Sequence, residues 1–291
     1  MRFSITVAFQ PVDQLAAIAK AADECGYDAI SIPDHVVDLE TLETPYPYTP
    51  DGKRRWEHSA DWPDPWVLAG ALAAVTTNIH FYTSVYVAAL RSPYQVAKSV
   101  GTAAALSGNR VALGVGVGWC REEFELMGQD FSTRGKRTDE ALALLAELWS
   151  PGWNSFEGEF YPTPRLVMEP TPTARIPIYV GGLSEVGMRR AARHDGWIGD
   201  LYSTEEAAKH AKRLAEIRDE LGREGDFRFI TALTDAFLPE QFAAAEEVGV
   251  TDVWTMPWAY YHGLECSLEQ KIDGIQRFAA DILEPLKKEN G

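Results

Sequence analysis

The chain has 291 residues, of which 46% are hydrophobic and 24% charged, and this composition excludes a wholly disordered protein. Transmembrane helices are excluded as well, because the longest uncharged apolar runs, such as 66–75, reach only about ten residues. Lys and Arg number 27 and Asp and Glu 43, and the resulting charge of −16 makes nucleic acid or an anionic membrane a poor partner.

The cysteines and the N-terminal residues indicate the cellular compartment in which the protein is expected. Cys25, Cys120 and Cys266 are far apart and odd in number, which is typical of reduced thiols and not of a disulfide framework or a zinc ribbon. The apolar stretch at the N-terminus ends at Gln10-Pro11, too early for a signal peptide. We therefore expect a cytoplasmic protein.

Apolar runs alternate with amphipathic segments from one end of the chain to the other. Apolar runs of this kind indicate strands buried on both faces, and residues recurring on one helical face indicate helices. Asp64-Pro65 and the capping-box pair Ser203 and Glu206 mark two helix starts. In chain order the sequence predicts strand 3–9, helix 12–25, strand 27–32, helix 66–77, strand 79–87, helix 93–106, strand 111–115, helix 133–149, strand 176–180, helix 184–193, strand 197–200, helix 203–221, strand 227–233, helix 239–248, strand 250–256 and helix 267–282.

Eight strand–helix units in this length predict an α/β fold, a (β/α)₈ TIM barrel, with an open doubly wound sheet as the alternative. No segment between the units has the composition of a linker, so we expect a single domain over residues 1–291. Two insertions interrupt the pattern, one after strand 2 (34–63) and one after helix 4 (152–175, rich in proline).

The insertion 34–63 follows a strand and therefore lies at the barrel mouth, where barrel active sites are built. Its aromatic residues Tyr46, Tyr48, Trp56 and Trp62 predict an apolar roof over a substrate. The insertion 152–175 follows a helix, so we expect it to pack across the bottom or edge of the barrel.

Asp34 and His35 stand where strand 2 ends, and a histidine there can donate a hydrogen bond or exchange protons near neutral pH. The alternative is a loop cap by Asp34 and an imidazole facing solvent. The acidic residues Glu122, Glu123 and Glu125 are interpreted as a solvated helix start. The six histidines show no metal-ligand spacing, so no metal site is expected.

Two glycine-rich segments follow strands 4 and 5. The run from Gly114 to Gly118 fails as a dinucleotide fingerprint, because its third glycine would fall at Trp119 and no helix opens there. Its glycines fit either close approach of a flat ligand or a bulged strand end. Gly181-Gly182-Leu183-Ser184 leads into a helix and fits either a ligand edge or a tight turn.

These positions together resemble a known family. The ordered set comprises Asp34-His35, Thr83-Ser84-Val85, Arg91-Ser92-Pro93, Leu106 to Val111, Gly114 to Trp119 with Glu122-Glu123-Phe124, Arg134 to Glu140, Pro177 to Gly182 and Asp195-Gly196-Trp197. The chain is similar to the bacterial luciferase-like family, in particular to its oxidoreductases that use the deazaflavin coenzyme F420. The match covers residues 3–200, and the last third matches only as a generic barrel.

The resemblance implies a flavin or deazaflavin in the barrel mouth. Asp34 and His35 match residues near the ring, and Ser84-Val85 matches a site where many relatives carry a non-proline cis peptide. Gly118-Trp119 and Gly181-Gly182, with Leu183, match loops that line the cofactor. Sugar-phosphate dehydrogenases of this branch place glutamate where Trp119 stands, which argues against a sugar phosphate and makes His35 the acid/base candidate. Asp34 is expected to orient either His35 or the edge of the cofactor ring.

The function expected from this resemblance is hydride transfer between F420 and a small organic alcohol, carbonyl or activated alkene. The relatives are usually dimers, so we expect a homodimer whose other partner is a small-molecule substrate. One alternative is an FMN-dependent monooxygenase supplied with reduced FMN by a separate reductase. An alternative of another class is a non-catalytic flavin-binding protein.

Overall fold

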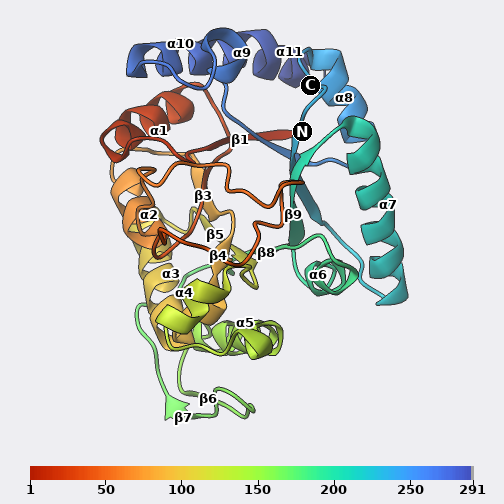
Figure 1. The fold of residues 1–291 in the computed structure, drawn as a ribbon. Helices are drawn as coiled ribbons and strands as arrows, with labels where there is room; N and C mark the ends of the chain where they lie inside the picture. Colours follow the sequence, from red (N-terminus) through yellow and green to blue (C-terminus); the bar gives the residue numbers. More distant parts are fainter. Residues whose placement is uncertain (290–291) are drawn as a thin grey trace.

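The computed structural model describes residues 1–289 and folds them into a closed barrel of parallel strands surrounded by helices (Figure 1). The barrel strands are β1 (Arg2–Thr6), β2 (Ala29–Ile32), β3 (His80–Thr83), β5 (Val111–Gly116), β8 (Ile178–Gly181), β9 (Gly196–Tyr202), β10 (Arg228–Leu233) and β11 (Asp252–Thr255). They neighbour one another in the order β3-β2-β1-β11-β10-β9-β8-β5, and a pairing of β3 with β5 closes the ring.

The third predicted strand is divided in two. After β3 the chain passes through Ser84 and Val85 and resumes as β4 (Tyr86–Val87), which pairs in parallel with β5. The sheet still closes, because Phe81 of β3 lies opposite Val111 of β5. The (β/α)₈ barrel predicted from the alternation of elements is therefore confirmed, and the open sheet is excluded.

Each barrel strand is followed by a helix that packs on the outside. These helices are α1 (Leu15–Glu24), α2 (Pro65–Ala73), α3 (Pro93–Ser107), α5 (Arg134–Leu148), α6 (Glu185–Ala191), α7 (Thr204–Glu220), α8 (Pro239–Glu247) and α10 (Leu268–Phe278). Shorter helices are α4 (Arg121–Leu126), α9 (Ala259–His262) and α11 (Glu284–Glu289). The predicted caps are formed: the Asp64 carboxylate accepts from the N–H groups of Trp66 and Val67 at 3.0 Å, and Ser203 and Glu206 make a capping box.

The core joins the two ends of the chain. Phe3 of β1 packs edge-on against Phe242 of α8 and Phe278 of α10, with ring centroids 5.3 and 5.8 Å apart. All three side chains are buried. The first and last thirds of the chain therefore share one hydrophobic core.

One arginine joins several segments at the end of the barrel away from the mouth. Arg110 lies just before β5, and each of its five N–H groups donates to a different acceptor. Nε donates to Ser107 O at 2.9 Å, Nη1 to Thr76 Oγ1 and Ile79 O, and Nη2 to the carbonyls of Ala73 and Thr76. The guanidinium thus ties the ends of α2 and α3 to the start of the neighbouring strands.

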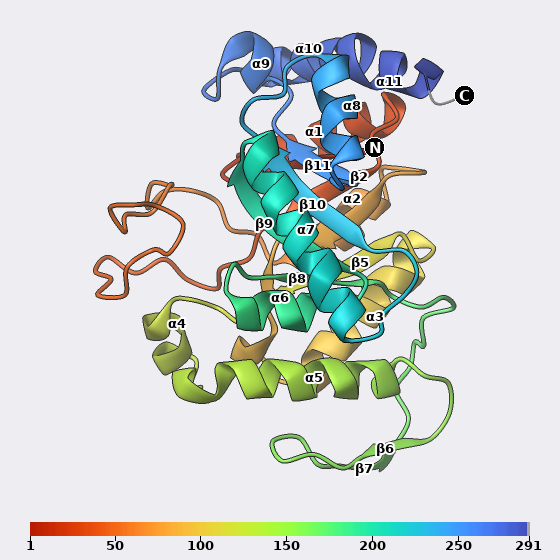
Figure 2. The ribbon, with the colours of Figure 1, turned by 90° about the vertical axis from the view of Figure 1, so that its right-hand side faces the viewer.

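The two insertions lie on different parts of the barrel. The loop 34–63 connects β2 to α2 and projects from one end of the barrel, as its orange trace shows in Figure 2. The insertion 152–175 contains the antiparallel hairpin of β6 (Asn154–Phe156) and β7 (Thr163–Leu166), which lies beyond α5 in both views (Figures 1 and 2).

The hairpin insertion is fixed to the outer helices. Glu140 of α5 accepts from the N–H groups of Phe160 and Tyr161 at 2.8 and 2.6 Å, and Tyr94 of α3 shares a 2.7 Å hydrogen bond with Thr163. The insertion therefore packs against α3 and α5 at the edge of the barrel, away from the mouth.

Candidate active site

A cavity of about 1000 Å³ opens at the carboxyl ends of the barrel strands. Every residue that the sequence nominates for the site borders it: Asp34, His35, Tyr48, Trp56, Trp62, Ser84, Val85, Gly118, Trp119, Gly181, Gly182 and Leu183. They come from the ends of four strands and from the loop 34–63. The barrel therefore brings together segments that are up to about 150 residues apart, as expected for a site of this fold.

Val85 forms part of the inner wall of this cavity. The Ser84–Val85 peptide bond is cis, as the resemblance implies. A Cβ atom added to Gly116 would lie 2.5 Å from Val85 Cγ2, and one added to Gly181 would lie 2.8 Å from Val85 Cγ1. The two glycines are thus required by the Val85 side chain, which fits between β5 and β8.

The other two glycines of the run, Gly114 and Gly118, serve packing as well. A Cβ atom added to Gly114 would lie 1.7 Å from the carbonyl oxygen of Thr83. Gly118 has a φ of +83°, and a Cβ there would lie 2.7 Å from both Phe124 and Val87. Any other residue would be strained by its backbone and by these neighbours. The glycine pattern after strand 4 is therefore explained by close contacts within the protein.

Aromatic side chains of the loop 34–63 form a roof over the outer part of the cavity. Trp56 lies at the centre, stacked on Phe9 at 5.7 Å and in edge contact with Trp62 at 5.1 Å and Tyr46 at 5.2 Å. Tyr46 also contacts Trp119, with ring centroids 5.2 Å apart. The indole N–H groups of Trp56 and Trp62 are buried without a hydrogen-bond partner among the described residues. We call this group of five rings the aromatic roof.

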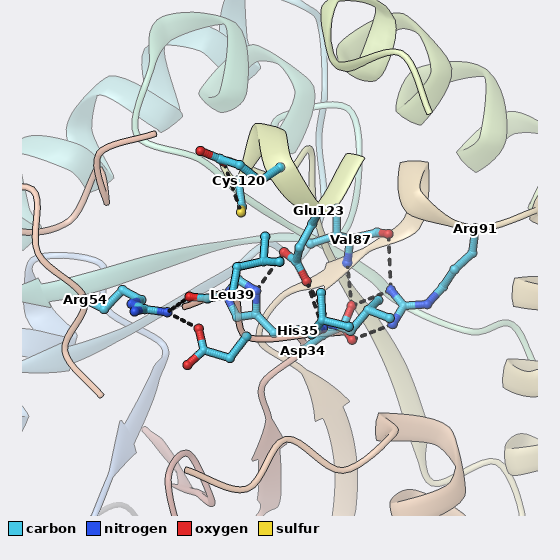
Figure 3. A network of polar contacts seen from close by, with 12 residues as sticks. Asp34, His35, Leu39, Arg54, Val87, Arg91, Cys120 and Glu123 are labelled. Atoms are coloured by element: carbon cyan, nitrogen blue, oxygen red, sulfur yellow. Dashed lines mark hydrogen bonds and ion pairs between the residues drawn. The ribbon is translucent and has the colours of Figure 1, made fainter. Parts of the chain in front are cut away.

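His35 lies beneath the aromatic roof and not in solvent. Its ring contacts Trp62 and Trp119, with centroids 4.7 and 5.8 Å away, and its side chain is 13% exposed. Nδ1 is 2.8 Å from Oε2 of Glu123, a residue of α4 (Figure 3). The alternative of a solvent-facing imidazole is therefore wrong.

Glu123 borders the cavity and contacts His35, although the sequence pattern did not indicate it as a site residue. Its side chain is 3% exposed, so the interpretation of the acidic run as a solvated helix start is wrong for this position. Burial by itself raises the pKa of the Glu123 carboxyl. The hydrogen bonds from His35 and from the N–H groups of Val36 and Val37 lower the pKa by more than burial raises it, so the pKa lies below its usual value. Glu123 is therefore an ionised, buried carboxylate.

Its neighbour Glu122 is also bound, to a later part of the same loop. Glu122 Oε1 accepts from the N–H groups of Glu43 and Thr44 at 2.8 and 2.9 Å. Burial raises the pKa of Glu122, but these backbone donors outweigh it and lower the pKa to about 2. The two adjacent carboxylates of α4 thus bind the backbone of the loop 34–63 at two places, 36–37 and 43–44.

Asp34 lies apart from the imidazole that it was expected to orient. Its carboxylate has no exposed surface, and both oxygens accept from Arg91, at 2.7 Å each, in a bidentate ion pair. Oδ2 also accepts from the N–H of Val87 at 2.9 Å (Figure 3). Within residues 1–289 the carboxylate that contacts His35 is that of Glu123, so Asp34 does not orient the imidazole. The other role expected of Asp34, at the edge of the cofactor ring, stays a prediction.

A second ion pair fastens the loop on the far side of the mouth. Both terminal nitrogens of Arg55 donate to Asp200 of β9 at 2.7 Å, and Nη2 also donates to the carbonyl of Tyr48. In the eight-membered ring β9 lies opposite β2, from which the loop starts. The loop therefore crosses the whole mouth.

The described part of the chain contains neither a metal-binding cluster nor a membrane-spanning helix. No group of three or more His, Cys, Asp or Glu side chains is arranged to hold a metal ion. No helix there has the length and apolar character to span a membrane.

Comparison with known proteins places this geometry in a family. Residues 1–265 match the family model described as luciferase-like monooxygenase. An uncharacterized protein of Mycobacterium tuberculosis is 37% identical over 286 residues, which cover 97% of this chain and 99% of that protein.

Two solved structures are similar in fold, each at 16% sequence identity. The monooxygenase RslO1 from Streptomyces bottropensis has a TM-score of 0.77 and covers 98% of this chain and 99% of its own. An F420-dependent secondary alcohol dehydrogenase in complex with an F420-acetone adduct has a TM-score of 0.74 and covers 97% and 98%. The family model spans the barrel and the residues of the mouth, and the chain therefore belongs to the luciferase-like monooxygenase family.

Proposed function

We propose that the chain is a coenzyme F420-dependent oxidoreductase that transfers a hydride between the deazaflavin and a small organic alcohol, carbonyl or activated alkene. The observation that carries this proposal is one cavity with Val85 in its inner wall, His35 at its side and the aromatic roof above. The similarity in fold to an F420-dependent alcohol dehydrogenase supports it.

The residues present fit a tricyclic cofactor. The cavity volume of about 1000 Å³ is at the upper end of small-molecule sites, which leaves room for a ring system and a small substrate. Val85, with the backbone of Gly116 and Gly181 beside it, offers a surface on which a flat ring can lie. Gly182 and Leu183 at the end of β8 would border its edge. When bound, the deazaflavin supplies the hydride chemistry.

The protein supplies proton transfer and a dry site. Oxidation of an alcohol releases a proton that His35 can accept, and reduction of a carbonyl requires a proton that His35 can donate. The aromatic roof keeps water from the reacting atoms. Trp56 and Trp62 offer two buried N–H donors for an oxygen of the substrate. The site therefore suits a neutral, largely apolar substrate with one polar oxygen.

Titration of the apoprotein with F420 and with FMN side by side tests the cofactor. We expect F420 to bind more tightly. A tenfold preference for FMN, about 1.4 kcal/mol, would contradict the proposal and favour the FMN-dependent monooxygenase. Oxygen uptake during turnover separates that monooxygenase from a dehydrogenase or reductase. A bound ring whose absorbance no substrate changes would indicate a non-catalytic binding protein.

The aromatic roof gives a second expected result. Trp56→Ala removes a ring of the roof, and Tyr48→Ala removes the ring that packs on Tyr46 of the roof at 5.3 Å. Both should raise KM or lower kcat, because they open the roof to water, while the free energy of unfolding changes little in a loop tied at its ends. Steady-state kinetics and urea denaturation measure the two effects. Trp153→Ala, an exposed aromatic in the hairpin insertion at 63% exposure, is the control. If both roof variants only unfold earlier at unchanged turnover, the roof is structural.

A further inference from the structure

Glu123 divides its two oxygens between the imidazole of His35 and the backbone of the loop that follows it. Oε2 lies 2.8 Å from His35 Nδ1, whereas Oε1 accepts from the N–H of Val36 at 2.8 Å and, more weakly, of Val37 at 3.4 Å. The three loop residues are consecutive, and Glu123 is 88 positions away from His35. One side chain thus contacts both the reactive ring and the start of the loop 34–63 (Figure 3).

This arrangement restricts the tautomer of His35. An ionised carboxylate can only accept hydrogen bonds, so the ring nitrogen that faces it must carry a proton. The neutral ring is then protonated at Nδ1, and Nε2 keeps its lone pair. Only this tautomer can accept a proton from an alcohol at Nε2, which is the step that the proposed function assigns to His35.

We propose that Glu123 is a positioning residue that fixes His35 in the Nδ1–H tautomer and makes that tautomer depend on the hydrogen bond between Glu123 and the N–H of Val36. The dependence arises because the same carboxylate needs both sets of donors. When the Val36 N–H leaves Oε1, the carboxylate loses one of the contacts that hold it in place, and the ring loses its fixed acceptor. The role of this tautomer in proton transfer rests on the proposed function. The tautomer itself and the contact with the loop are independent of the proposed function.

Replacement of Glu123 by glutamine makes a sharp test, because an amide has one accepting end and one donating end. The N–H groups of Val36 and Val37 require the accepting oxygen, and this turns the amide NH₂ toward His35 Nδ1. Nδ1 must then accept, so the proton moves to Nε2. Glu123→Gln is therefore expected to invert the tautomer of the neutral ring while the fold is kept.

The tautomer is read by ¹⁵N NMR of the protein without cofactor or substrate, with the signals of His35 assigned by their loss in His35→Asn. We expect Nδ1–H in the wild-type protein and Nε2–H in Glu123→Gln. A wild-type ring protonated at Nε2, or the same tautomer in both proteins, would overturn the proposal. The wild-type spectrum decides the first point even if the variant fails to fold.

Hydrogen exchange tests the link to the loop. In Glu123→Ala the amide of Val36 should exchange at least about tenfold faster than in the wild-type protein, because a hydrogen bond to a charged acceptor is lost. Unchanged exchange of Val36 would contradict the link.

Glu122→Gln is the matched control for both measurements. The backbone N–H groups of Glu43 and Thr44 donate to Oε1 of Glu122, which a glutamine carbonyl can replace, and Glu122 makes no contact with His35 among the described residues. It should leave the tautomer of His35 and the exchange of Val36 unchanged. A change of tautomer in Glu122→Gln equal to that in Glu123→Gln would assign the effect to the net charge of α4 and overturn the proposal. Since neither readout needs F420, failure of the proposal is distinct from failure of the proposed function.

Discussion

Replacement of His35 by asparagine is expected to lower kcat by about 10²–10⁴-fold, the usual range for general acid–base catalysis, while the cofactor stays bound. Asparagine can still accept or donate a hydrogen bond, but it cannot exchange a proton near neutral pH. His35 lines the cavity, and its ring is enclosed by Trp62 and Trp119. Bulk water therefore does not readily take over the proton transfer when the imidazole is removed.

Steady-state kinetics with the F420-loaded protein and a separate binding titration measure this effect. His58→Asn is a suitable control, because His58 lies in the same loop and is 58% exposed, paired with Asp38. A loss below threefold with an unaltered pH–rate profile would remove His35 from the mechanism. A loss of cofactor binding would instead make its role one of positioning the ring.

Replacement of Asp34 by alanine is expected to cost about 3–5 kcal/mol of the free energy of unfolding, because it leaves the guanidinium of Arg91 buried without its carboxylate. The Arg91 side chain is 15% exposed, and it stacks on Tyr86 at 4.3 Å, so it cannot turn into water without losing packing. Denaturant unfolding monitored by fluorescence measures the change.

The Arg55–Asp200 pair is the matched comparison for this experiment. It is bidentate too, but its side chains are 30% and 17% exposed, so Asp200→Ala should cost only about 0–1 kcal/mol. The double variant Asp34→Ala/Arg91→Ala should lose less than the sum of its single variants. If Asp34→Ala leaves stability unchanged and abolishes turnover, Asp34 acts in the chemistry and not in the fold.

The barrel could be predicted because its signals are local. Each strand is a short apolar run, and residues such as Asp64 and Ser203 mark helix starts within the segment they cap. The first strand shows the limit: predicted to Phe9, it ends at Thr6. Phe9 has a φ of +62° and its ring stacks on Trp56 as part of the aromatic roof. An apolar residue that extends the strand pattern therefore belongs to the site.

The polar contacts of the site could not be predicted, because they join distant segments. Glu123 and His35 are 88 residues apart, and Asp34 and Arg91 are 57 apart. Nothing in the run Glu122-Glu123 tells which carboxylate is buried, since the distinction depends on the loop 34–63 lying over α4. The resemblance to the family did identify Ser84–Val85, where the peptide bond is cis.

The expected homodimer and the cytoplasmic location stay predictions, because a single chain tests neither. The outer faces of α2 and α3 do carry exposed apolar side chains, Val67 at 73% and Leu106 at 69%. Both residues were expected to lie in helices, but the sequence pattern did not distinguish their exposed positions from those of the core.

Arg110 has a consequence for how this barrel can change. Its five donors have five acceptors, so a lysine, with three donors, would leave at least two of these groups without a partner. Replacement of Arg110 by lysine is therefore expected to be destabilising, although it keeps the charge. The aromatic roof at the mouth is constructed differently, from rings that pack on one another. Substitutions in the roof can therefore change the substrate preference of such a barrel. At the opposite end every N–H group of Arg110 already has an acceptor, so substitution of this residue disturbs the contacts between helices and strands.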